Sequence, residues 1–192
     1  MAVPTNFTTL DFTGKYVMNK SLSDPHDDIL AAQGIGWITR KAIGIATITV
    51  YVKHYKDEQG VEHIDIEEKL TGGIQGTPEK RTLYWKERQT SDQIFGELME
   101  KSRRVTDLSI VEPDDEWFKG NWTADSLEYG LVQCCDESHT PKSGKTWIGN
   151  QLWGIEEVNG ERRHSRHVHF TGGNGKVIKA RLLYDYIGPL DS

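Results

Sequence analysis

Hydrophobic and polar residues alternate along most of this chain, but one early stretch has a helical period instead. In "LDFTGKYVMNK", residues 12–18 place apolar or small side chains at every second position, which is the period of a half-buried strand. In the next stretch, Asp24 is suited to an N-cap, Pro25 to the first helical position and Gly34 to a C-cap. The pattern therefore predicts a strand followed by a helix over roughly 25–33.

A second helix is predicted from Gly36 onward. If this segment is helical, four apolar side chains fall on one stripe: Ile35, Ile38, Ala42 and Ile45. We expect this stripe to form the apolar underside of a helix-turn-helix. That underside would cover the open end of whatever sheet the rest of the chain forms.

From Ala46 to the end, the period changes to two. The strand-like segments are "TITVYVKHY", "VEHIDIEEKL", "RTLYWKER", "DQIFGELMEKSRRV", "SLEYGLVQCC", "KTWIGNQLWGIEEV", "RRHSRHVHF" and "KVIKARLLYDYIG". Asn-Gly steps in "VNGE" and "GGNGK" favour hairpins between the late segments. An antiparallel, up-and-down meander of about nine or ten strands is the simplest arrangement, with an irregular insertion around "VEPDDEWFKGNWTAD".

A sheet of this kind leaves two exposed edges unless it closes on itself. We therefore predict a mainly β fold, a single antiparallel β-barrel with a two-helix lid after the first strand. Closure requires residues 12–19 to pair with the last strand, near 177–187. The length of 192 residues fits one domain spanning 1–192.

Composition narrows the classes of partner. Asp and Glu number 29 against 23 Lys and Arg, and the resulting net charge of −6 argues against nucleic acid as a partner. No apolar run is long enough to insert into a membrane, and the first residues lack the features of a secretory signal. Cys134 and Cys135 are sequence neighbours, a poor arrangement for a disulfide, so we expect a cytoplasmic protein.

Two local motifs resemble one known family. The first is "FTGKY", and the second is a spaced pattern formed by Ala32, Gly34, Gly36, Thr39 and Arg40. Together they resemble the intracellular fatty-acid-binding proteins of the lipocalin-like (calycin) group, over residues 12 to about 70. The resemblance implies a barrel with a helical lid over an internal cavity. Two departures stand out: Tyr16 replaces a tryptophan, and the closing Arg-x-Tyr motif is present only as "RLLY", with Arg181 and Tyr184 on opposite faces.

The predicted ligand-binding residues are mostly aromatic. Leu83 and Trp85 share one strand face, and Trp147 and Trp153 share another. Aromatic side chains offer a large contact area at little cost in rotamer entropy, which suits a hydrophobic ligand. The full predicted set is Tyr16, Trp37, Ile38, Tyr51, Leu83, Trp85, Tyr129, Trp147, Trp153, Arg181 and Tyr184.

The segment "HSRHVHF" concentrates histidine and arginine. His167 and His169 share a strand face, but His164 points to the other face and no further ligand completes a metal set. We therefore predict no metal and no cofactor, and we expect this basic segment to lie on a solvated barrel exterior. A haem or metal barrel remains the lowest-ranked alternative.

No catalytic motif occurs in the sequence. Individual acid–base candidates on strands are Glu68, Glu87, Glu97, Glu128, Asp185, Tyr51, Tyr129 and Tyr184. Such groups usually face solvent, but a carboxyl group inside an apolar barrel would have a raised pKa and could act as a general acid. The sequence contains no phosphate-binding loop, no dinucleotide fingerprint and no Ser-His-Asp context.

Two functions fit these observations. The first is intracellular binding of a small hydrophobic molecule beneath the lid. The second is a cofactor-independent, pericyclase-like cyclase or isomerase of natural-product biosynthesis, which would fold a flexible substrate into a reactive conformer. Related lipocalin-like barrels serve such cyclisations, and the chain's extra length and aromatic content resemble that use. The ligand, the choice between carrier and catalyst and the oligomeric state stay open.

Overall fold

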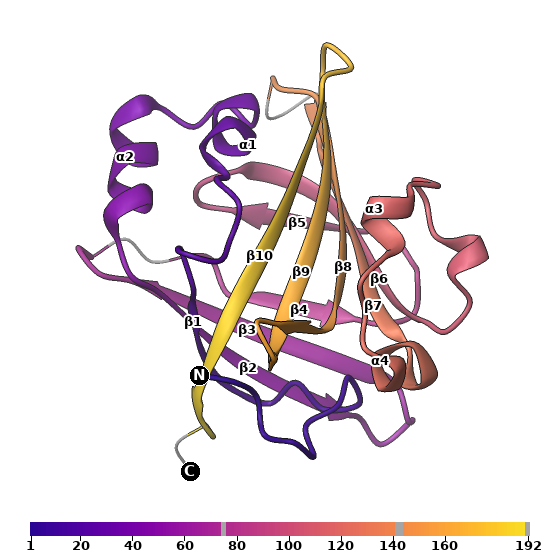
Figure 1. Cartoon of the computed structure of the whole chain (residues 1–192). Helices are drawn as coiled ribbons and strands as arrows, with labels where there is room; N and C mark the ends of the chain where they lie inside the picture. The colour runs from indigo at the N-terminus through magenta and orange to yellow at the C-terminus, as the bar shows by residue number, and fades with distance from the viewer. Residues whose placement is uncertain (74–75, 141–143, 191–192) are drawn as a thin grey trace.

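The computed structural model describes residues 1–73, 76–140 and 144–190. Its strands are β1 (Gly14–Met18), β2 (Ile48–Lys56), β3 (Glu62–Leu70), β4 (Glu79–Thr82), β5 (Arg88–Asp92), β6 (Gly96–Val105), β7 (Leu131–Ser138), β8 (Trp147–Val158), β9 (Glu161–Gly172) and β10 (Val177–Gly188). They form one antiparallel sheet in the order β4-β3-β2-β1-β10-β9-β8-β7-β6-β5 (Figure 1). The predicted fold class is confirmed.

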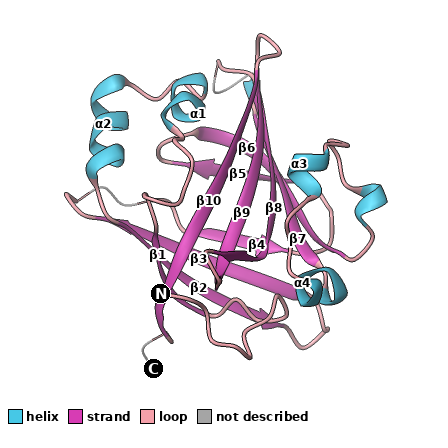
Figure 2. Cartoon of the chain, viewed as in Figure 1, coloured by secondary structure: helices cyan, strands magenta, loops and turns pink. Residues whose placement is uncertain are grey.

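Short helices lie outside this curled sheet (Figure 2). They are α1 (Asp27–Ala32), α2 (Trp37–Ile45), the 3-10 helix η1 (Leu108–Ile110), α3 (Glu116–Lys119) and α4 (Ala124–Tyr129). The helices α1 and α2 follow the first strand, as predicted, and form what we call the lid. The other three belong to the irregular segment between β6 and β7, which we call the insertion (residues 106–130).

The first and last strands pair, as closure requires. Strand β1 is hydrogen-bonded to β10 with Tyr16 opposite Tyr186 and Met18 opposite Tyr184, which confirms the predicted pairing. The strands at the two ends of the sheet order, β4 and β5, are connected by side chains rather than by a backbone ladder. The Arg88 guanidinium donates to the Lys80 carbonyl across this seam. The sheet is therefore a half-barrel curled so that its end strands meet at a narrow seam.

Alternation of side chains divides the strands into an inner and an outer face. The lower part of the barrel is filled by an apolar core that includes Tyr16, Val50, Ile66, Trp153 and Ile155. A separate apolar cluster lies on the outer face of β7 and β8, where the insertion packs Phe118 and Trp122 against Leu131 and Leu152. The region between this core and the lid remains open and forms the site described below.

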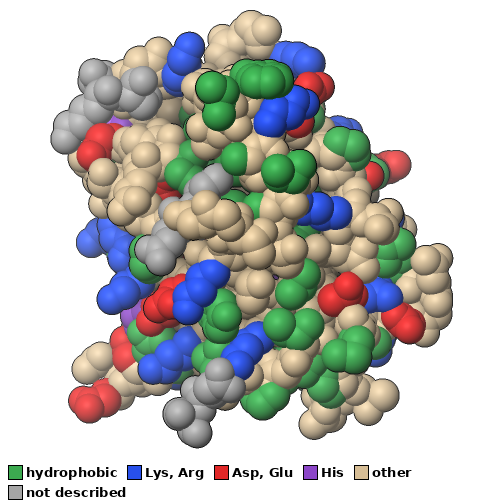
Figure 3. All heavy atoms as spheres, turned by 90° about the vertical axis from the view of Figure 1, so that its left-hand side faces the viewer, with side chains coloured by type: hydrophobic (Ala, Val, Ile, Leu, Met, Phe, Trp, Pro, Cys, Tyr) green, Lys and Arg blue, Asp and Glu red, His purple; other side chains and the backbone are tan. Residues whose placement is uncertain are grey.

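The orientation of α2 differs from the prediction. Only Ile43 of this helix is buried, while Ile38 is 78% exposed, Ile45 is 88% exposed and Trp37 is 64% exposed. At 100° per residue, Ile43 lies about 140° from Ile38 and about 160° from Ile45, so burying Ile43 turns both isoleucines outward. The expected stripe therefore does not cover the barrel. Figure 3 views the side that carries α2 and shows hydrophobic side chains among Lys and Arg at the surface.

Within the described ranges, none of the helices is both long enough and apolar enough to cross a membrane.

The orientation of α2 predicts opposite outcomes for two matched substitutions. Ile43→Asp places a carboxylate in the buried contact with the barrel and should lower the free energy of unfolding by about 2–5 kcal/mol. Ile38→Asp places the same group in solvent and should change it by less than about 0.5 kcal/mol. Urea denaturation of both variants measures this difference, and equal losses would show that α2 is rotated from the orientation described here.

Candidate functional site

A cavity of about 540 Å³ lies between the lid and the lower core of the barrel. This volume is within the range of small-molecule sites. Its upper part, which we call the apolar chamber, is lined by α1, by the β5–β6 turn and by inward-facing strand positions. The chamber residues include Ile29, Leu70, Phe95, Leu98, Trp147 and Phe170.

Charged and polar side chains line the lower part of the cavity, which we call the polar floor. They come from seven strands and are Glu68, Glu79, Arg81, Glu100, Asp136, Gln151, Arg166 and Tyr184. Strand alternation places them there: on β9, Arg166, Val168 and Phe170 occupy successive inward positions that lead from the floor to the chamber. The cavity is therefore amphipathic, with an apolar end beneath the lid and a charged end above the core.

Most charges of the polar floor are neutralised by partners. Arg81 is held by Asp136 in a bidentate ion pair, with nitrogen–oxygen distances of 2.9 and 3.0 Å, and it also contacts Glu79 at 2.8 Å. Arg88 pairs with Glu100. Bidentate guanidinium–carboxylate pairs of this kind fix both side chains in place. These pairs shape the floor and leave little net charge on it.

Arg166 differs from the other arginines of the floor because no described residue provides a carboxylate partner for it. It is 5% exposed, and among the described residues no acidic group lies within salt-bridge distance of it. Its guanidinium carbon lies 4.2 Å from the Trp153 ring centroid and 4.9 Å from that of Tyr184. Its Nε donates to His164 Nε2 at 3.4 Å. Aromatic faces stabilise a cation only partly, so the site contains a buried positive charge that is not neutralised.

The neighbours of Arg166 are held in their neutral forms. Burial, and then the charge of Arg166, lower the pKa of His164 to about 3. Its neutral ring donates through Nδ1 to the Gly154 carbonyl, so its Nε2 can accept. Burial raises the pKa of Tyr184 to about 12. At neutral pH, His164 and Tyr184, the two titratable groups in contact with Arg166, are therefore both uncharged.

Three of the predicted ligand residues lie at the cavity. Trp147 and Tyr184 line it, and Trp153 supports the guanidinium from below. Tyr16 is fully buried in the lower core, where its hydroxyl donates to the Phe12 carbonyl at 2.7 Å.

Other predicted ligand residues lie away from the cavity. Trp37 and Ile38 are on the exposed side of α2. Tyr51 points to the outer face of β2, where the Lys69 ammonium lies 4.6 Å from its ring centroid. Arg181 is on the outer face of β10, with its guanidinium 3.9 Å from Glu156.

The remaining predicted residues lie near the seam or the insertion. Leu83 packs partly buried against the lower core. The guanidinium carbon of Arg103 lies 4.0 Å from the centroid of the Trp85 ring. The backbone φ of Trp85 is 56°, which is typical of a turn rather than a strand. Tyr129 ends α4, and its carbonyl accepts from Arg104. None of these three side chains lines the cavity.

The histidine-rich strand is buried, not solvated as expected. The insertion covers the outer face of β9, where His167 lies between Trp117 and Trp122 at centroid distances of 5.0 and 4.2 Å. His167 Nε2 is 3.1 Å from Glu156, whose other oxygen accepts from the Ser165 hydroxyl at 2.7 Å. In the part of the chain that the structure describes, no group of three or more His, Cys, Asp or Glu is arranged to hold a metal.

The sequence contained a weak signal for the residues that were missed. On β3, the inward positions are Ile64, Ile66, Glu68 and Leu70, so Glu68 interrupts an apolar row. On β9, the inward positions are His164, Arg166, Val168 and Phe170, so Arg166 lies next to two apolar inward positions. Glu68 was one of several acid–base candidates, but without the strand register neither residue could be assigned to the inside.

Comparisons with known proteins agree with this architecture. No protein-family model matches the chain. It is 29% identical over 189 residues to the probable pericyclase scpY of Mollisia scopiformis, covering 98% of this chain and 96% of that protein. It is 28% identical over 193 residues to the pericyclase pydY of an Acremonium species, covering 98% of each chain.

Solved structures with similar folds include lipid-binding proteins. A Schistosoma mansoni fatty acid binding protein in complex with arachidonic acid has a TM-score of 0.52 and 15% identity, and the match covers 92% of this chain and 96% of that one. Lipid binding protein 8 of Caenorhabditis elegans has a TM-score of 0.55 and 10% identity, with coverages of 92% and 95%. These likenesses establish a fatty-acid-binding-protein-like, calycin-type fold.

The unequal pairing of the two buried arginines predicts unequal effects on stability. Asp136→Leu leaves Arg81 without its bidentate partner and should cost about 3–5 kcal/mol of unfolding free energy. Arg166→Met replaces an unpaired buried charge with an apolar side chain of similar shape, so the free energy of unfolding should stay unchanged or rise. Urea denaturation at neutral pH compares the two, and a large loss in Arg166→Met would show that Arg166 has a structural role.

Proposed function

We propose that the protein is a cofactor-independent cyclase of the pericyclase type, acting on an elongated apolar substrate with one oxygen-bearing polar end. The observation that carries this proposal is the buried Arg166, which has no ion-pair partner among the described residues and lies at the polar end of an amphipathic cavity. Two relatives named as pericyclases align with the chain over nearly its full length, which supports the same reaction class. The product would be an isomer of the substrate, with a new ring and the same mass.

The apolar chamber supplies proximity. A flexible chain of conjugated double bonds entering beneath the lid would have to fold back to fit between Phe95, Trp147 and Phe170. Holding two reacting segments together in a near-attack geometry can lower a barrier by several kcal/mol without any catalytic group. Exclusion of water by the chamber also protects reactive double bonds and carbonyl groups.

Arg166 supplies electrostatic stabilisation. Charge that builds up on a carbonyl oxygen during ring closure would be met by a cation whose position is already fixed by Trp153 and Tyr184. Because no carboxylate within the described residues neutralises it, its charge is available to the substrate. The guanidinium therefore both orients the polar end and stabilises the transition state.

The described cavity lining does not favour covalent catalysis. Burial raises the pKa of the Cys134 thiol to about 12, so this thiol stays protonated. Ser165 donates to Glu156 on the outer face of the sheet, away from the cavity. Positioning and charge stabilisation are the contributions that this geometry supports.

A carrier for a hydrophobic molecule is the second candidate. The fold and the apolar chamber favour it, and the same cavity would be used. We also propose that the protein acts in the cytoplasm, since both cysteines are free thiols, and that nucleic acid is not a partner.

A panel of linear polyenyl ketones and carboxylic acids tests the proposal. We expect at least one to be converted to a cyclic isomer of equal mass, detected by liquid chromatography with mass spectrometry and assigned by NMR. Arg166→Met should lower turnover about 10²-fold, whereas Arg166→Lys should retain more of it because the charge is kept. Saturable binding with every compound recovered unchanged would establish the carrier instead, and no binding at all would contradict both functions.

A further inference from the structure

Glu68 is a second unusual group in the cavity wall. It occupies an inward position of β3, between the buried Ile66 and the chamber residue Leu70. The backbone of Gly76 passes over it, with a hypothetical Cβ at this glycine only 3.2 Å from the Glu68 Cβ. The surface that remains open on this carboxyl group faces the cavity.

The charged groups around Glu68 come from three other strands. Glu79 on β4 and Asp92 on β5 bring negative charge, while Arg166 on β9 and Arg81 on β4 bring positive charge. Burial, followed by Glu79, raises the pKa of Glu68 to about 7, against the smaller opposing effect of Arg166. At neutral pH and below, a large fraction of Glu68 is thus the neutral carboxylic acid.

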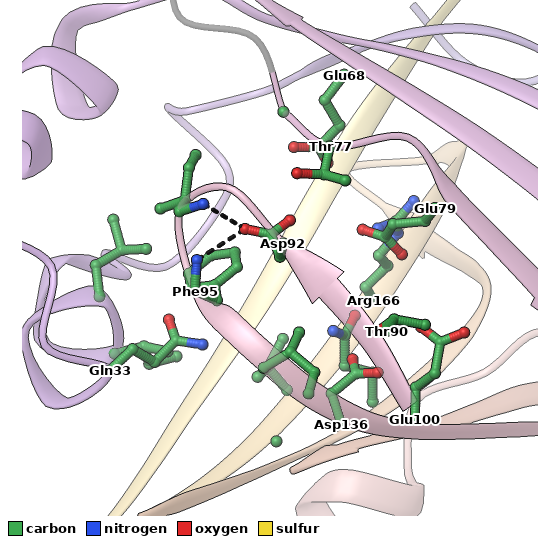
Figure 4. Close-up of a pocket in the computed structure, with 18 of the residues that line it drawn as sticks. Gln33, Glu68, Thr77, Glu79, Thr90, Asp92, Phe95, Glu100, Asp136 and Arg166 are labelled. Atoms are coloured by element: carbon green, nitrogen blue, oxygen red, sulfur yellow. Dashed lines mark hydrogen bonds between the residues drawn. The ribbon is translucent and has the colours of Figure 1, made fainter. Parts of the chain in front are cut away.

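The carboxylates near Glu68 have hydrogen-bond or ion-pair partners, whereas the Glu68 carboxyl group has none among the described residues. Asp92 accepts from the backbone amides of Ile94 and Phe95 at 2.6 and 2.7 Å (Figure 4). Glu79 forms an ion pair with Arg81. Within residues 1–73, 76–140 and 144–190, no side chain donates a hydrogen bond to the Glu68 carboxyl group. Among the described residues its carboxyl group therefore has no hydrogen-bond partner, and it lines the cavity where a bound molecule would lie.

We propose that Glu68, as a carboxylic acid, donates a hydrogen bond to the carbonyl oxygen of the bound molecule and so polarises that carbonyl for ring closure. This role rests on the proposed cyclase function, but the donor itself would also serve a carrier. The proton remains on Glu68 at the end of the reaction, so substrate and product stay isomers. Donation to an oxygen that gains charge in the transition state accelerates the reaction. Arg166 supplies the permanent charge, and Glu68 supplies a donor that depends on pH.

A fluorescent ketone tests the donor without knowledge of the natural substrate. The probe is 6-dodecanoyl-2-dimethylaminonaphthalene, which has an apolar tail and a carbonyl whose emission moves to longer wavelength when it accepts a hydrogen bond. Bound to the wild-type protein, it should emit at longer wavelength at about pH 5.5 than at about pH 8.5, with a midpoint near the pKa of Glu68 at about 7.

Matched variants assign that change to Glu68. Glu68→Gln keeps the shape and an N–H donor but cannot ionise, so the emission of the bound probe should no longer depend on pH. Glu68→Met removes the hydrogen-bond donor, so the bound probe should emit at the shorter wavelength at every pH. Glu79→Gln should move the midpoint to lower pH because a neighbouring negative charge is lost, and Arg166→Met should move it to higher pH because a positive charge is lost.

The outcomes separate the two proposals. A pH-dependent emission shift that persists unchanged in Glu68→Gln, or the absence of a shift in the wild-type protein, would overturn the role of Glu68 while leaving the cyclase open to its own assay. If the emission shift depends on Glu68 but no compound of the panel is converted to an isomer, the role of Glu68 as a donor stands and the cyclase function is contradicted. Failure of the probe to bind would contradict the cavity itself. Circular dichroism of each variant confirms that it is folded.

Discussion

The register of β9 between β8 and β10 fixes the positions of nearly all the chemistry in this molecule. Arg166 is paired with Trp153 on one side and Leu182 on the other, so these three side chains face inward together. Their neighbours Ser165 and His167 face outward as a consequence. A slip of one residue would exchange the two sets and would place a histidine in the cavity and the arginine under the insertion.

The two faces of β9 use buried polar groups in different ways. On the outer face, His167, Glu156 and Ser165 satisfy one another beneath the insertion, so this cluster holds the insertion to the sheet. On the inner face, Arg166 has aromatic neighbours, and none of the described residues forms an ion pair with it. Folded proteins rarely leave a buried charge unpaired, because the desolvation is not recovered within the fold. The inner face therefore resembles a binding site that awaits a complementary group, and Glu68 extends it across the cavity.

The sequence predicted those features that depend on local period and on sheet closure. The alternating stretch at 12–18, the helix ended by Gly34 and the closing Asn-Gly hairpin led to the strand, the lid and the pairing of β1 with β10. These features follow from local residue propensities, which a single sequence displays, and from the general need of a sheet to remove its exposed edges. The fatty-acid-binding-protein-like fold was likewise visible in "FTGKY" and the spaced glycines.

The features that were missed depend on contacts distant in sequence. The face of α2 was misassigned because three isoleucines compete for burial, and only the position of the helix on the barrel selects Ile43. The histidine strand was expected in solvent because nothing local shows that the insertion folds back over it. Most of the aromatic candidates lie away from the cavity, since aromatic residues serve the core and outer clusters as well. The polar floor could not be predicted without knowing which positions of seven strands face one another.

The most direct test of the central claim is a crystal structure of the protein with a long-chain methyl ketone. An amphipathic cavity with hydrogen-bond donors on its polar floor favours one orientation of the ketone. The carbonyl oxygen should lie within hydrogen-bond distance of Glu68 or Arg166, with the alkyl chain running past Leu98 and Phe170 towards the lid. A ketone bound with its carbonyl under the lid and its chain against the polar floor, or bound outside the barrel, would contradict the account.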